Sequence, residues 1–159
     1  MLFRSEDGQW VPTFPNARYL FHSKEYEHWQ AETDQREVFE DSVAPVMAAG
    51  LAQLVESDHE VAPGVRLMPT PGHTAGHCSV VLGASGTDGV ITGDMVHHPI
   101  QIADPDIISR VCYDPHQAAA TRRERMAAWS RDETLVLGTH FAAPDRKSTR
   151  LNSSHLVIS

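Results

Sequence analysis

The sequence predicts a mixed α/β (α+β) fold, on two kinds of observation. Two stretches carry apolar residues at helical spacing, residues 42–57 and residues 114–131. Short apolar or β-branched runs, separated by Pro and Gly, predict strands. These runs cover residues 17–22, 65–68, 78–82, 89–94 and 134–140.

The first forty residues predict little regular structure. Residues 1–16 are expected to form a loop, since Asp7-Gly8 is a turn signal. After the strand over residues 17–22, Ser23 can cap a short helix that reaches about residue 30. Residues 31–41 are polar and acidic, so we expect a surface segment there.

The two longer helices have a predicted apolar face. In residues 42–57 this face includes Val46, Leu51 and Leu54, and Pro45 falls in the first turn, where its missing N–H costs nothing. The helix over residues 114–131 begins with an Asp114 cap and Pro115 at its first position. Its predicted apolar side consists of Ala118, Ala119, Met126 and Trp129, and the cluster from Arg122 to Arg125 is expected on its solvent side.

Composition narrows the class of protein. The chain has 159 residues, 41% apolar and 21% charged, which suits one globular domain. The net charge of −8 leaves no basic stripe for phosphates, so we expect no nucleic-acid partner. No apolar run reaches the roughly 18 residues of a membrane span and no signal peptide is visible, so we expect no membrane partner and a cytoplasmic location. Cys78 and Cys112 lack zinc spacing and are predicted to be reduced, buried thiols.

Three residues that can bind metal ions share one context. His73, Asp94 and His140 each follow a predicted strand and stand at the start of the next loop. Strand ends are rigid, and the loops beyond them are where ligands gather. Imidazole nitrogen suits zinc and iron, and a carboxylate can bridge two cations. Each residue alone is weak evidence; their order and spacing together predict a metal site.

Three motifs surround these residues and resemble a known family. The strings are TPGHTAGHCSVVL, VITGDMVHHPIQ and LGTHF. They are similar, in order and spacing, to the third, fourth and fifth signature motifs of the metallo-β-lactamase superfamily. The string after Asp94 and the opening WVPTFPNA further resemble its lactonase and organophosphate-hydrolase branch. The resemblance implies the second half of an αββα sandwich over residues 1–144.

The resemblance also implies roles and cofactors. His73 would be a ligand of the first metal, Asp94 the bridging carboxylate that also orients the nucleophile, and His140 a ligand of the second metal. The implied cofactor is zinc, two ions in the intact family site, with iron or manganese as alternatives. Apart from the resemblance, position in the chain leads us to expect that His77 is structural or supports the site, and that His97 or His98 forms a hydrogen bond near the site or touches substrate.

The sequence departs from the family in one large respect. The family's main metal motif is His-x-His-x-Asp-His, and none of the ten histidines here forms a His-x-His pair. We therefore expect a C-terminal fragment whose missing motif lies upstream, and a chain that alone binds metal weakly and is inactive. Residues 145–159 are polar and basic without periodicity, so we expect a disordered, non-native tail.

Three functions follow from these observations. The first is part of a metal-dependent hydrolase that cleaves a lactone, ester, phosphotriester or similar bond in a small-molecule substrate with metal-activated water. The second is an iron-dependent oxidoreductase of the same superfamily. The third is a non-catalytic remnant or binding module. The sequence leaves a homodimer open and does not name the substrate.

Overall fold

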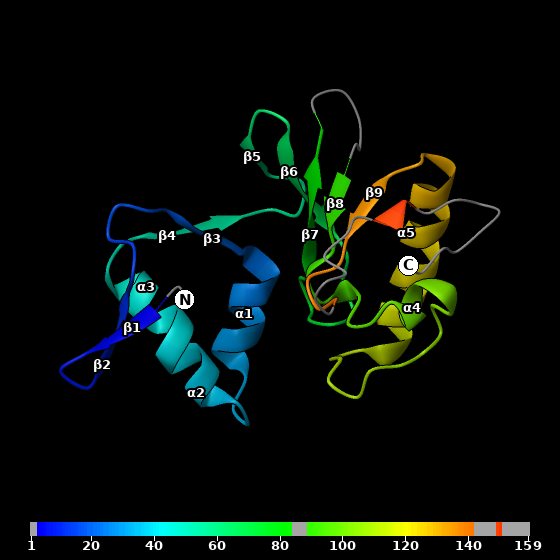
Figure 1. The fold of residues 1–159 in the computed structure, drawn as a ribbon. Coiled ribbons are helices and arrows are strands. Elements are labelled where there is room, and N and C mark those ends of the chain that lie inside the picture. Colours follow the sequence, from blue (N-terminus) through cyan, green and yellow to red (C-terminus); the bar gives the residue numbers. More distant parts are fainter. Residues whose placement is uncertain (1–2, 84–88, 142–148, 151–159) are drawn as a thin grey trace. The chain divides into compact units, whose positions relative to one another are not determined.

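The computed structural model describes residues 3–83, 89–141 and 149–150 (Figure 1). The chain divides into two compact units, Met1–Glu56 and Ser57–Ser159. No helix among the described residues is long and apolar enough to cross a bilayer. The tail predicted over residues 145–159 lies outside the description, apart from a two-residue strand, β10 (Thr149–Arg150).

The first unit opens with a β-hairpin where a loop was predicted. Strands β1 (Phe3–Glu6) and β2 (Gln9–Pro12) pair antiparallel. Asp7 and Gly8 have φ angles of 50° and 78°. Two successive positive φ angles match the twist of a tight hairpin, and Asp-Gly is a preferred pair for it. The turn signal was therefore correct, but the strands beside it were missed.

A parallel strand pair with a helical crossover forms the rest of this unit. Strand β3 (Tyr19–His22) pairs with β4 (Ala52–Val55). Parallel strands need a long connection, usually helical. This crossover contains α1 (Ser23–Ala31), α2 (Arg36–Val38), the π-helix η1 (Phe39–Val43) and α3 (Ala44–Ala48).

Two predictions for the crossover were wrong, and a third was correct. The helix expected over residues 42–57 ends at Ala48, because Gly50 adopts a φ of 68° and the chain then enters β4. Ser23 is the first residue of α1 and not its cap, and its hydroxyl donates to the Val55 carbonyl. The surface segment expected over residues 31–41 is confirmed as mostly exposed, although it contains helical turns and Phe39 is buried.

The second unit is built on a six-stranded sheet in the order β10-β9-β8-β7-β6-β5. Besides β10, its described strands are β5 (Glu60–Ala62), β6 (Val65–Pro69), β7 (Cys78–Leu82), β8 (Gly89–Ile91) and β9 (Leu135–Leu137). The last four fall on the predicted apolar runs, but β8 and β9 each end three residues before the predicted end. The short helices η2 (Gly93–Met95) and α4 (Ile100–Ala103) follow β8.

Helix α5 (Pro115–Arg131) lies along one face of this sheet (Figure 1). The Asp114 cap is confirmed, since its carboxylate accepts from the Gln117 N–H. The four residues predicted for its apolar side are all buried. They include Met126 and Trp129, which pack against Val81, Val90 and Val136 of the sheet. The predicted solvent side was wrong at one position, because Arg122 is fully buried.

Candidate metal site

Strand direction brings the three predicted residues to one edge of the sheet. β7 is antiparallel to both β6 and β8, and β9 is parallel to β8, so β6, β8 and β9 point the same way. Ile91 and Leu137 are partners in the β8–β9 register, and Asp94 and His140 each follow three residues later. They therefore leave the sheet side by side.

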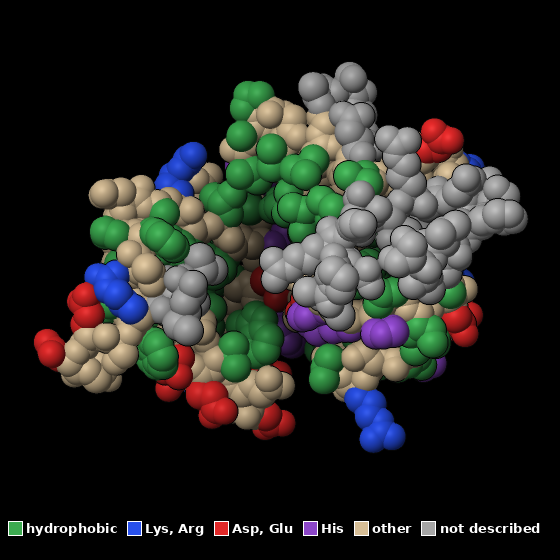
Figure 2. All heavy atoms as spheres, in the orientation of Figure 1, with side chains coloured by type: hydrophobic (Ala, Val, Ile, Leu, Met, Phe, Trp, Pro, Cys, Tyr) green, Lys and Arg blue, Asp and Glu red, His purple; other side chains and the backbone are tan. Residues whose placement is uncertain are grey.

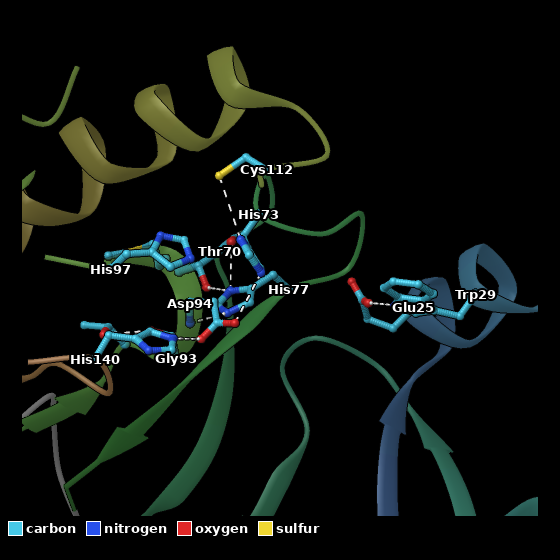
Figure 3. A network of polar contacts seen from close by, with 12 residues as sticks. Glu25, Trp29, Thr70, His73, His77, Gly93, Asp94, His97, Cys112 and His140 are labelled. Carbon is cyan, nitrogen blue, oxygen red and sulfur yellow. Dashed lines mark hydrogen bonds and ion pairs between the residues drawn. The ribbon is translucent and has the colours of Figure 1, made fainter. Parts of the chain in front are cut away.

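The side chains meet at this edge (Figure 3). His73 Nε2 lies 3.2 Å from Asp94 Oδ2, and His140 Nε2 lies 2.6 Å from Asp94 Oδ1. Each oxygen of the carboxylate thus faces a different imidazole. The structure brings together the three residues that the sequence predicted, from segments that are far apart in the chain.

The loop that carries His73 is fixed against the start of α5. The Tyr113 and Asp114 N–H groups donate to the carbonyls of His73 and Gly72, both at 2.9 Å. Gly72 has a φ of 130°, and a Cβ built there would lie 2.3 Å from the Ala118 nitrogen. Only glycine permits this approach. The Pro-Gly-His sequence therefore places the His73 ring by backbone packing.

Asp94 is held through its backbone by His77. The Asp94 N–H donates to His77 Nε2 at 3.0 Å, so Nε2 is an acceptor and Nδ1 carries the ring proton. Nδ1 then donates to Thr70, whose hydroxyl oxygen and carbonyl oxygen lie at 2.8 and 3.1 Å. This series of hydrogen bonds continues from the Thr70 hydroxyl to Ser79, which donates to the Thr92 carbonyl. Both ring nitrogens of His77 have partners, which fits a supporting role.

His97 stands inside the site. Its ring centroid lies 4.8 Å from that of His73 and 5.3 Å from that of His140. One ligand atom each from His73, Asp94 and His97 lie within 4.8 Å of one another. His97 Nδ1 is buried and has no hydrogen-bond partner among the described residues. A nitrogen left unpaired in this way fits a role as a metal ligand.

His98 has a different position. Its side chain is exposed, and its Nδ1 accepts from the Ile100 N–H at the start of α4. Buried Gln101 accepts from the His97 N–H at 2.8 Å and donates to the Ile107 carbonyl at 3.0 Å. The structure therefore brings His97 into the group around Asp94 and gives His98 a local backbone contact.

The charges around Asp94 keep it ionised. Burial raises the pKa of Asp94, but the hydrogen bond from His140 and the charges of His73, His140 and His97 together lower it below its ordinary value. Burial and the charge of His73 lower the pKa of His97. One carboxylate among imidazoles is a donor set that zinc accepts. The residues present therefore fit a divalent metal, and Figure 2 shows histidine side chains (purple) gathered on part of this surface.

Sequence reasoning missed residues behind the site. Gln101 gave no signal, since nothing in its neighbours marks it as buried. Cys112 was expected to be buried, but not beside His73, whose Nδ1 is 3.8 Å from the thiol sulfur. Arg122 carried a signal that was passed over: it lies four residues after Ala118 and four before Met126, on the apolar face of α5.

Comparisons with known proteins agree with this geometry. The family model described as the metallo-beta-lactamase superfamily matches residues 7–140. An N-acyl homoserine lactonase from Bacillus sp. is 35% identical over 69 residues, which are 43% of this chain and 25% of that protein.

Solved structures share the fold at low identity. Hydrolase AbOPH of the beta lactamase superfamily aligns with a TM-score of 0.74 and 24% identity, over 96% of this chain and 60% of that chain. AidC, a dizinc quorum-quenching lactonase, aligns with a TM-score of 0.70 and 16% identity, over 84% of this chain and 51% of that chain. This chain thus spans about half the length of these structures. The mixed α/β fold and the resemblance predicted from the motifs are confirmed, and the chain belongs to the metallo-β-lactamase superfamily.

Proposed function

We propose that this chain is the part of a metal-dependent hydrolase that carries His73, Asp94, His97 and His140 as donors to zinc. The observation that carries the proposal is the Asp94 carboxylate, which faces a different imidazole with each oxygen while His97 adds a third ring beside them. A divalent metal supplies a Lewis acid that lowers the pKa of water toward neutrality and polarises the bond to be cleaved.

The surroundings of each residue determine the role that we propose for it. Asp94 stays negatively charged, and the His77 contact fixes its backbone, so it can hold cations and accept a hydrogen bond from an attacking water. His73 is held by the loop packed against α5 and presents Nε2. His140 is more exposed, with 46% of its side chain accessible, and can adjust as metal and substrate enter.

We propose a lactone, ester or phosphotriester as the substrate class. Support comes from relatives whose descriptions include N-acyl homoserine lactonase, a lactonase with an N-hexanoyl homoserine product, and a hydrolase of the beta lactamase superfamily. A small-molecule carbonyl or phosphoryl centre suits attack by activated water. Because the sequence contains no His-x-His-x-Asp-His motif, we expect this chain alone to bind zinc weakly and to turn over little substrate.

Calorimetric titration with zinc tests the proposal. We expect the wild-type chain to bind with a dissociation constant near or above about 1 μM. Asp94→Asn removes the charge and should abolish the binding heat. Asp58→Asn, at an exposed turn position, is the matched control and should bind as the wild type does. Absence of wild-type binding at about 1 mM zinc, or equal binding by Asp94→Asn, would contradict the proposal.

A further inference from the structure

Arg122 of α5 is a fully buried cation. It donates from Nε to the Pro105 carbonyl at 2.9 Å, from Nη2 to the Ile107 carbonyl at 2.9 Å and from Nη1 to the Met95 carbonyl at 3.4 Å. No carboxylate in the described part of the chain forms an ion pair with it. Burial of an unpaired cation is costly, and burial lowers the pKa of Arg122. Three carbonyl dipoles around the guanidinium offset part of this cost.

These carbonyls belong to the segment that carries His97. Met95 directly follows Asp94, and Pro105 and Ile107 follow α4, so the guanidinium ties both ends of residues 95–107 to α5. Gln101 lies between them and shares the Ile107 carbonyl with Arg122. Its other end accepts from the His97 N–H. A continuous set of hydrogen bonds therefore runs from Arg122 to the backbone of His97.

A second path leads from Arg122 to His73. Ile107, whose carbonyl Arg122 holds, lies two residues before Ser109, and the Ser109 carbonyl accepts from the Cys112 N–H at 3.3 Å. The Cys112 sulfur is in turn 3.8 Å from His73 Nδ1, the ring nitrogen that faces away from Asp94 (Figure 3). In metal sites the outer ring nitrogen of a ligating histidine has a partner that fixes the tautomer.

We propose that Arg122 is a positioning residue that holds the rings of His73 and His97 in place to bind one divalent metal ion together with Asp94. This inference rests on the proposed function of the site. Arginine suits the role because its planar fork reaches three acceptors at once, whereas the point charge of lysine does not. The guanidinium donates to backbone carbonyls, so we assign it a positioning role and not the role of a ligand.

The test compares Arg122→Lys and Arg122→Met with Arg123→Met in the full chain. Arg123 is the matched control, since it is the next residue of α5 and pairs with Asp106 at the exposed surface. Zinc affinity is measured by competition with a chromophoric chelator, and the ring nitrogens are observed by NMR without metal. We expect both Arg122 variants to lose about tenfold or more in zinc affinity. The ring signals of His73 and His97 should shift while those of exposed His116 stay unchanged.

Gln101→Met interrupts the path to His97, and it provides the test if Arg122→Met fails to fold. It should shift the His97 ring signal and leave that of His73 in place. Arg122→Lys with wild-type circular dichroism, zinc affinity within about twofold of wild type and unchanged ring signals would overturn the inference. A wild-type chain that binds no zinc contradicts the proposed function instead, and the ring signals then decide whether Arg122 holds the two histidines.

Discussion

Replacement of His77 tests how the backbone of Asp94 is held. His77→Ala removes the acceptor of the Asp94 N–H and the donor to Thr70. A buried N–H without a partner costs about 1–3 kcal/mol, and a lost hydrogen bond costs about 1 kcal/mol more. We therefore expect the free energy of unfolding to fall by about 2–4 kcal/mol. His77→Gln keeps an acceptor and a donor on its side chain and should recover part of this loss.

Urea unfolding followed by circular dichroism measures the effect, with His116→Ala as control. His116 is exposed near the start of α5, so its replacement should change the free energy of unfolding by less than about 0.5 kcal/mol. A His77→Ala variant as stable as His116→Ala would refute the inference that Nε2 of His77 supports Asp94. Zinc affinity should also fall in His77→Ala, because the carboxylate would lose its fixed backbone.

Further predictions concern the loop of His73, the helix cap and pH. Gly72→Ala should lower the free energy of unfolding in urea by more than about 2 kcal/mol, because its Cβ would collide with the Ala118 backbone. Gly8→Ala, with no atom within 4 Å of its Cβ, should lose stability only through backbone strain. Equal losses in the two variants would contradict this. Asp114→Ala should destabilise the chain by about 1 kcal/mol through the lost cap, measured by thermal unfolding. The pKa of His97 is lower in the folded chain than in the unfolded chain, where it is about 6.5, so protonation favours the unfolded chain. The contribution of neutral His97 to stability is therefore present above about pH 6.5 and is lost as the pH falls below this value. Urea unfolding across this range should show a weaker pH dependence in His97→Gln, and an unchanged dependence would contradict the assignment.

The sequence predicted the fold class and the three residues that the structure brings to one edge of the sheet. Each of His73, Asp94 and His140 follows an apolar strand, and the order and spacing of the three motifs predicted that they act together. The structure adds the shared direction of β6, β8 and β9, which brings them to one edge. The cap and buried face of α5 followed from Asp114 and the apolar spacing in the same way. Whether these residues bind metal stays a prediction until zinc is added.

The errors arose where two patterns competed. Residues 42–57 have helical spacing, but Gly50 ends the helix. Strand β4 then pairs with β3, whose partner residues lie 33 positions earlier in the chain. Arg122 was assigned to solvent because of its charge, although its position on the helix faces the core. Its carbonyl partners lie in irregular segments, whose course no local pattern predicts.

X-ray absorption at the zinc edge of the loaded chain tests the central claim most directly. We expect nitrogen and oxygen neighbours at about 2.0–2.1 Å with the scattering pattern of at least two imidazoles. This pattern should be lost in Asp94→Asn. A shell without imidazole, or one dominated by sulfur at about 2.3 Å, would show that zinc binds elsewhere and that the edge of the sheet around Asp94 is not a metal site.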